Sequence, residues 1–233
     1  ASIGLPLAAL VLWLMARMGD HWWLWVWLTW VGFSLLLMLV FPTWIAPLFN
    51  KFLPLEDAEL KADIEALLQR CGFTSSGVFV MDGSKRSNHG NAYFTGLGQS
   101  KRIVFFDTLL RQLTPAQILA VLAHELGHFH HRHIFKRLTW SFALMLGLFW
   151  LLGLLMQQSW FYQGLGVATP STAAALLLFF LTLPVFTFPF APIGSWISRK
   201  QEFEADAYAA QHASADDLVD ALAWIERALR ILE

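Results

Sequence analysis

The stretch WWLWVWLTWVGFSLLLMLVF, residues 22–41, contains twenty consecutive residues without a charged side chain. A helix of about 20 apolar residues crosses the hydrocarbon core of a bilayer, and the tryptophans at its beginning suit the membrane–water interface. Three more apolar segments occur, at residues 1–16, 140–160 and 171–197. The whole chain is 57% hydrophobic and 14% charged, whereas a soluble domain carries about 25% charged residues. We therefore predict a mainly α, multi-span membrane protein.

Basic residues near the ends of the apolar segments set the expected orientation. Lys136 and Arg137 precede the third segment, Arg199 and Lys200 follow the fourth, and the loop between these two segments has no Lys or Arg. By the positive-inside rule, the polar parts of the chain face the cytoplasm. The formal net charge of −1 provides no broad basic surface, so we expect no nucleic-acid partner.

The polar region before the third apolar segment has clear local signals. Residues 55–70 alternate charged and apolar side chains in the pattern of an amphipathic helix. GVFVMD at 77–82 and NAYFTGLGQSKRIVFFD at 91–107 are rich in β-branched and aromatic residues, and they indicate two or three short antiparallel strands. TPAQ at 114–117 is a typical helix start, with Thr as N-cap, Pro in the first turn and Gln at the third position.

The helix that begins there contains HELGH, residues 124–128. His124 and His128 are four positions apart, so they lie on one face of the helix and both imidazoles can reach one metal ion. Glu125 stands beside them, where it can act as a general base. A catalytic zinc needs a third protein ligand. The metzincin pattern does not supply one, because this chain has His131 and Ile134 where that pattern has Gly and His.

The segment RKQEFEADAYAAQH, residues 199–212, follows the fourth apolar segment and offers three carboxylates. Glu202 and Asp206 are four apart on the expected helix and share a face. This spacing favours Glu202 as the third ligand and Asp206 as the acceptor that fixes the imidazole of His124. Glu204 is expected to point roughly the opposite way.

Three more histidines follow HELGH. His131 is seven positions after His124 and therefore near the same helix face, so it is the one other histidine expected near the metal. His130 and His133, together with Arg132, are expected at the solvent-exposed end of the helix.

Three separated motifs, NAYFTGLGQSKRIVFFDTLL, HELGH and SRKQEFEADAYA, resemble the CAAX prenyl protease 1 family of integral-membrane zinc metalloproteases, which are of the gluzincin type. They are more distantly similar to the HtpX-type membrane proteases. The resemblance extends over about residues 41–210. It implies one zinc ion with His124, His128 and Glu202 as ligands, and Glu125 as the catalytic base.

The resemblance also implies a fold and a substrate-binding element. The expected fold combines transmembrane helices with a zincin-like catalytic domain that holds a small antiparallel β-sheet. The strand beginning at Asn91 resembles the family's substrate-binding edge strand, which pairs with an extended peptide. Its predicted substrate-binding residues are Asn91, Ala92, Tyr93 and Phe94, while Asp206 joins Glu125 as a predicted catalytic residue.

The expected organisation has four parts. Two transmembrane helices occupy 1–41, a cytoplasmic catalytic part occupies 42–139, two more transmembrane helices occupy 140–197, and helices with the third zinc ligand occupy 198–233. The sequence begins at Ala1 without a basic leader, so we expect it to start inside a longer protein.

The predicted function is that of a zinc-dependent integral-membrane endopeptidase. Its expected substrates are peptides or lipidated proteins, cleaved near the C-terminus of prenylated CAAX proteins or in related membrane-associated peptides, and membrane lipid is a further partner. The expected membrane is the inner membrane if the source is bacterial and the endoplasmic reticulum if it is eukaryotic. Two alternatives stay open. One is an HtpX-like quality-control protease. The other is a truncated, catalytically weak zinc-binding scaffold, because the family's His- and Arg-bearing segment has no match after Ala210.

Overall fold

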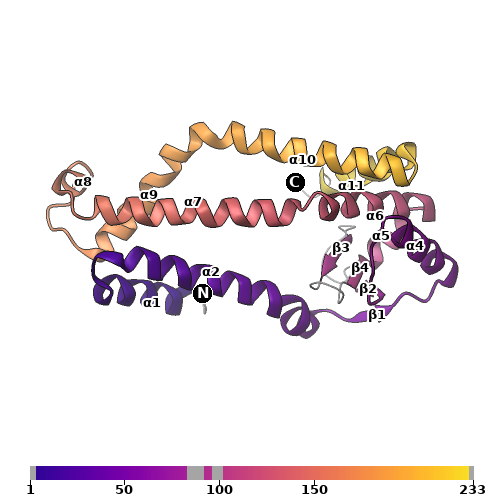
Figure 1. The fold of residues 1–233 in the computed structure, drawn as a ribbon, viewed down its shortest axis with the longest axis horizontal. Coiled ribbons are helices and arrows are strands. Elements are labelled where there is room, and N and C mark those ends of the chain that lie inside the picture. Colours follow the sequence, from indigo (N-terminus) through magenta and orange to yellow (C-terminus); the bar gives the residue numbers. More distant parts are fainter. Residues whose placement is uncertain (1–3, 83–91, 96–101, 231–233) are drawn as a thin grey trace. The chain divides into compact units, whose positions relative to one another are not determined.

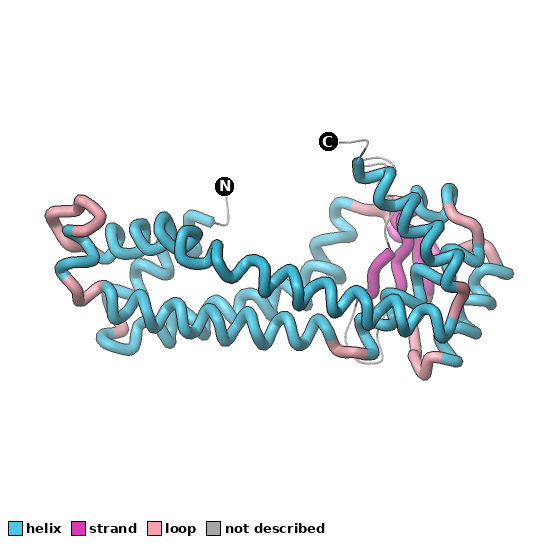
Figure 2. The backbone as a smooth tube through the Cα atoms, turned by 90° about the horizontal axis from the view of Figure 1, so that it is seen from above, coloured by secondary structure: helices cyan, strands magenta, loops and turns pink. Residues whose placement is uncertain are grey.

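The computed structural model describes residues 4–82, 92–95 and 102–230. Helices make up most of it (Figure 1), and in the described part of the chain the strands are confined to one region (Figure 2). The chain forms two compact units, one from 1–37 with 135–196 and the other from 38–134 with 197–233. Each unit is therefore assembled from two segments that are far apart in the sequence.

The first unit consists of apolar helices. Among the described residues, three helical runs are long and apolar enough to cross a membrane, namely 19–40, 133–155 and 172–212. The remaining apolar helix has 14 residues, a length of about 21 Å, which is short of the roughly 30 Å hydrocarbon core. The helices of this unit are α1 (Gly4–Arg17), α2 (Trp22–Val40), α7 (His133–Leu155), α8 (Ser159–Gln163) and α9 (Thr172–Thr187), with the 3-10 turn η1 (Gly19–His21) before α2.

The predicted mainly helical membrane fold is confirmed, with two changes in helix bounds. The third apolar helix begins at His133, seven residues before the predicted start at 140. The fourth apolar segment is α9, followed by the 3-10 turn η4 (Phe188–Phe190) and then by α10 (Ala191–His212). Prolines interrupt the helical hydrogen-bond ladder, which explains the turn between α9 and α10.

The apolar unit has its own core. The indole N–H of Trp27 on α2 donates to the backbone carbonyl of Phe142 on α7 at 2.8 Å, and the ring of Trp30 meets the Phe142 ring edge-on. The buried side chains come from five helices: Leu14, Met15, Trp22, Val26, Phe149, Leu152, Phe161, Tyr162, Ala175 and Phe179.

The second unit contains the sheet and the polar helices. Asp57 caps α4 by accepting hydrogen bonds from two backbone N–H groups, and Thr114 and Gln117 form the predicted capping box at the start of α6. The elements are the π-helix η2 (Phe41–Ile45), α3 (Ala46–Phe49), β1 (Phe52–Pro54), α4 (Ala58–Arg70), β2 (Val78–Met81), β3 (Ala92–Thr95), β4 (Arg102–Phe106), α5 (Asp107–Gln112), α6 (Pro115–His130), the polar part of α10, and α11 (Ala215–Arg230).

The sheet has the strand order β1-β2-β4-β3. The pair β3–β4 is antiparallel, as predicted, and β1, which lies outside the predicted strands, pairs antiparallel with β2. Strands β2 and β4 run parallel, so the prediction of a wholly antiparallel sheet is wrong for the central pair. Strand β4 buries three consecutive residues, 103–105, and such a continuous apolar run suits a central strand. Because β4 takes the centre, β3 becomes an edge strand.

A single apolar cluster fixes helix α6 in this unit. Ile64 and Leu67 of α4, Phe105 of β4, and Ile118 and Leu122 of α6 are all buried within it. Each such side chain contributes about 1.5–3 kcal/mol of transfer free energy. The helix that carries HELGH is therefore held by the sheet, by α4 and by α11.

Helix α10 approaches α6 at a glycine. A Cβ atom added to Gly127 would lie 2.8 Å from the Cα of Ala205 and 3.0 Å from its carbonyl oxygen. Only a pair of small residues allows two helix backbones to come this close. The contact places HELGH directly beside EFEAD.

Gly127→Ala is therefore expected to destabilise the second unit, although alanine is the better helix former. The added methyl group must push α10 away from α6, at a cost of about 1–3 kcal/mol, which equals or exceeds the helix-propensity gain of about 1 kcal/mol. Thermal unfolding of the purified chain measures the effect. Gly147→Ala in α7 is the control, because a Cβ there meets nothing within 4 Å. Equal melting temperatures for the two variants would show that the helices are not in tight contact.

Candidate metal centre

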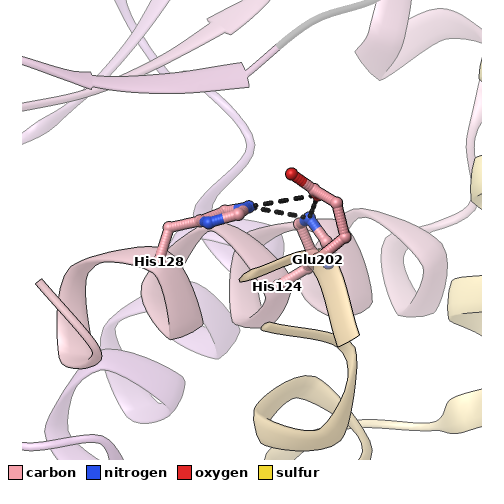
Figure 3. A group of neighbouring side chains, drawn as sticks. All are labelled: His124, His128 and Glu202. Carbon is pink, nitrogen blue, oxygen red and sulfur yellow. Dashed lines mark hydrogen bonds and ion pairs between the residues drawn. The ribbon is translucent and has the colours of Figure 1, made fainter. Parts of the chain in front are cut away.

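Two helices bring three side chains to one point. His124 and His128 extend from α6, Glu202 extends from α10, and Figure 3 shows them facing one another. The two Nε2 atoms are 3.2 Å apart. Glu202 Oε2 is 3.5 Å from His124 Nε2 and 3.4 Å from His128 Nε2. The structure thus brings together the three residues predicted as metal ligands.

These separations fit a tetrahedral zinc ion. Zinc binds imidazole nitrogen and carboxylate oxygen at about 2.0–2.1 Å, so two ligand atoms of one tetrahedron lie roughly 3.3 Å apart. All three measured separations are close to that value. The side chain of Glu202 is 47% exposed, so the group is open on one side, as a catalytic site with a vacant position requires. The donor set of two histidines and one carboxylate is also typical of catalytic zinc.

Asp206 fixes the orientation of the first histidine. His124 Nδ1 lies 2.8 Å from Asp206 Oδ1, and because a carboxylate is an acceptor, the ring donates its Nδ1–H. The Nδ1–H tautomer presents the lone pair of Nε2 toward His128 and Glu202. The structure places Asp206 where the i, i+4 spacing from Glu202 predicts it.

Glu125 is held in a partly buried position within the same helix. Burial raises the pKa of its carboxyl above the ordinary value, Glu202 nearby raises it further, and His124 offsets part of the effect. A base is most effective when its pKa approaches the working pH. The environment therefore suits the role of general base that the HELGH pattern predicts.

The prediction that His133 lies at the exposed helix end is wrong. His133 is only 1% exposed, and its Nδ1 lies 2.9 Å from His128 Nδ1. Its Nε2 donates to Glu204 Oε2 at 2.9 Å. The reason is that α6 stops at His130 and the chain turns, with Arg132 in the left-handed region at φ 55°.

The other nearby histidines lie outside the group of three converging ligands. His131 was predicted near the metal, but its ring stacks on His133 at 5.5 Å between centroids. His130 is exposed, as predicted, and lies against Tyr208. Glu204 was predicted to point away from the ligands, and its carboxylate bonds His133, which in turn bonds His128.

The predicted substrate strand is described only in its backbone. Asn91 lies outside the described residues, whereas Ala92, Tyr93 and Phe94 form β3 with Thr95. Strand β3 is the edge of the sheet and lies next to α6. In the described part of the chain its second edge pairs with no strand, so it is available for an added strand.

Comparisons with known proteins show which families this chain resembles. The sequence profile of peptidase family M48 matches residues 54–226, and that of the CAAX prenyl protease N-terminal region, with five membrane helices, matches residues 1–51. CAAX prenyl protease 1 homolog of Dictyostelium discoideum is 39% identical over 215 residues, covering 90% of this chain and 50% of that protein. CAAX prenyl protease 1 of Saccharomyces cerevisiae is 39% identical over 205 residues, covering 81% and 45%.

The fold has a close counterpart among solved structures. A crystal structure of S. mikatae Ste24p superimposes with a TM-score of 0.83 and 38% sequence identity, covering 97% of this chain and 56% of that one. The chain therefore spans about half the length of the proteins that it matches.

Glu202→Ala is expected to abolish stoichiometric zinc binding, because two imidazoles alone leave the ion without its third protein ligand. Zinc content after dialysis should fall from about one ion per chain to a small fraction of one. Asp220→Ala, which removes an exposed carboxylate from α11, should leave zinc content unchanged. Full zinc occupancy in the Glu202 variant would exclude this carboxylate as a ligand.

Proposed function

The chain belongs to peptidase family M48, and from this premise we propose that it is a zinc-dependent membrane endopeptidase that cleaves near the C-terminus of prenylated CAAX proteins. The observation that supports the proposal most strongly is the convergence of His124, His128 and Glu202 within 4.8 Å. The substrate class is carried over from the curated relatives, which are named CAAX prenyl protease 1.

The ligand set and Glu125 divide the chemistry between them. A zinc ion held by His124, His128 and Glu202 would polarise the scissile carbonyl and lower the pKa of water. Glu125 follows His124 directly on α6, and its carboxylate removes the proton of the attacking water and delivers it to the leaving amine. Asp206 holds the His124 ring in the tautomer that keeps Nε2 available.

The membrane-spanning helices bring the catalytic unit to lipid-anchored substrates. The protein is an integral membrane protein, with apolar helices over 19–40, 133–155 and the first part of 172–212. We propose that the catalytic unit faces the cytoplasm, because Lys136 and Arg137 lie near the start of α7, and 199–200, directly after the apolar part of α10, are Arg and Lys. The membrane is then the inner membrane of a bacterium or the endoplasmic reticulum of a eukaryote.

Strand β3 supplies a mode of substrate binding. An extended peptide that pairs with the outer edge of β3 would add a strand to the sheet beside α6. Backbone hydrogen bonds of this kind hold a chain in the extended form without strong demands on its side chains. This suits an enzyme that recognises its substrates by a lipid and a chain terminus.

Glu125→Gln tests the catalytic assignment. The amide keeps the shape of the side chain but cannot accept a proton, so peptide hydrolysis should fall by about 10²–10⁴-fold, with zinc content unchanged. The measurement is the rate of peptide cleavage by the purified chain before and after chelation and zinc restoration. An active Glu125→Gln variant would refute the role of this carboxylate.

The substrate class needs a separate test. A farnesylated peptide ending in a CAAX sequence should be cleaved with a kcat/KM at least about tenfold above that of the same peptide without the lipid, because the prenyl chain transfers from water to an apolar site. Both peptides are assayed with wild type, and Glu125→Gln serves as the blank. Equal kcat/KM values for the two peptides would be consistent with an endopeptidase but would show that the enzyme does not recognise the prenyl group.

A further inference from the structure

We propose that His133 and Glu204 are positioning residues, which act through His128 to hold the metal ligand in its binding orientation. The inference rests on the proposed zinc site. It concerns two residues that belong neither to the HELGH motif nor to the ligand set. Their contacts form a chain from α10 back to α6, from Glu204 through His133 to His128.

The carboxylate of Glu204, at the end of this series of hydrogen bonds, determines where the protons of the two imidazoles lie. The carboxylate of Glu204 is an acceptor, so the Nε2 of His133 carries the hydrogen. With its hydrogen on Nε2, His133 accepts at Nδ1, and the hydrogen between the two rings belongs to Nδ1 of His128. His128 is left with the lone pair of Nε2, which is the atom that faces His124 and Glu202. The three residues thus select the tautomer that a metal ligand needs.

His133 is buried, and burial makes its hydrogen bonds to His128 and Glu204 energetically important. His133 is among the largest fully buried side chains of the described chain, at 1% exposure. A polar ring in such a place needs its hydrogen bonds, because an unpaired buried donor or acceptor costs about 1–3 kcal/mol. His133 satisfies both nitrogens, one on His128 and one on Glu204. The buried ring of His133 therefore links the carboxylate of Glu204 to His128 through two direct hydrogen bonds.

The backbone is shaped to place His133 there. In an uninterrupted helix, residue 133 would be rotated roughly 140° from residue 128 about the axis. The chain instead turns after α6, where the N–H groups of His131 and Arg132 donate to the carbonyls of Gly127 and Phe129. Arg132 adopts φ 55°, a conformation that costs a residue with a Cβ about 1–2 kcal/mol. Arg132 therefore adopts this unfavourable conformation in the turn that brings His133 back beside His128.

The two histidine ligands are therefore supported differently by one helix. Asp206 of α10 bonds His124 directly, and Glu204 of the same helix reaches His128 through His133. Glu202 and Glu204 are two positions apart and leave the helix in nearly opposite directions. The intervening imidazole spans the extra distance. All three carboxylates of EFEAD thus serve the same centre.

Zinc affinity measures this role without relying on turnover. The full chain, purified in detergent, is titrated against a competing chelator to obtain the apparent Kd for zinc. His133→Leu should weaken binding by about 10–100-fold, the usual effect of losing an outer partner of a ligand. The control His130→Leu removes an exposed histidine three residues away and should change the Kd by less than about twofold.

Two further variants separate positioning from damage to the fold. His133→Asn keeps an acceptor at the place of Nδ1 and should recover most of the affinity lost in His133→Leu. Glu204→Leu should weaken binding in the wild-type background and have little effect in the His133→Leu background, because Glu204 acts through His133. Absorption of the cobalt-substituted chain should shift with His133→Leu and not with His130→Leu.

The outcomes distinguish this inference from the proposed function. If the wild-type chain binds no stoichiometric zinc, the proposed metal site is refuted, and with it the proposed function. Tight zinc binding in the wild type, with equal affinities for His133→Leu and His130→Leu, would overturn only the positioning role. Fully additive losses from Glu204→Leu and His133→Leu would also overturn it, since the two residues would then act independently.

Discussion

Gly127 meets Ala205 where α6 and α10 pack, and this backbone contact sets the distance between the two halves of the proposed metal centre. The side chains of the histidines on α6 and of the carboxylates on α10 are short. Their ligand atoms therefore converge only if the two helices lie this close. An ion with bonds of about 2 Å tolerates little change in that distance. Packing of small residues, hydrophobic burial of α6 and metal geometry are therefore parts of one constraint.

The second requirement is that each imidazole presents the correct nitrogen. Both ligand rings bond through Nδ1 to acceptors and turn Nε2 toward Glu202. One acceptor is a carboxylate, and the other is a buried imidazole that in turn bonds a carboxylate. Such partners fix ring orientation and increase ligand basicity. In the proposed zinc site, the short segment EFEAD thus supplies the third ligand and orients the other two.

Much of this could be predicted from the sequence, because the signals are local. Capping by Thr114 and Gln117 and the apolar face of α4 were read correctly, and the resemblance drawn from three motifs is confirmed by the family match. The i, i+4 spacings placed His124 with His128, and Glu202 with Asp206. These pairs depend only on helix geometry.

The parts that could not be predicted depend on long-range or unmarked features. The parallel pairing of β2 and β4 is decided by burial of β4 in the whole unit, and alternation within one strand carries no such information. The turn at Arg132 has neither Gly nor Pro to mark it. The sequence therefore predicts that α6 continues through residue 133, and on such a helix His133 would face solvent. The role of Asn91 in substrate binding stays a prediction.

X-ray absorption at the zinc edge of the purified chain tests whether two histidines and a carboxylate hold the metal. We expect a first shell made only of nitrogen and oxygen at about 2.0–2.1 Å, with the multiple-scattering pattern of two imidazoles. A sulfur neighbour at about 2.3 Å, or a pattern that requires fewer than two imidazoles, would contradict it.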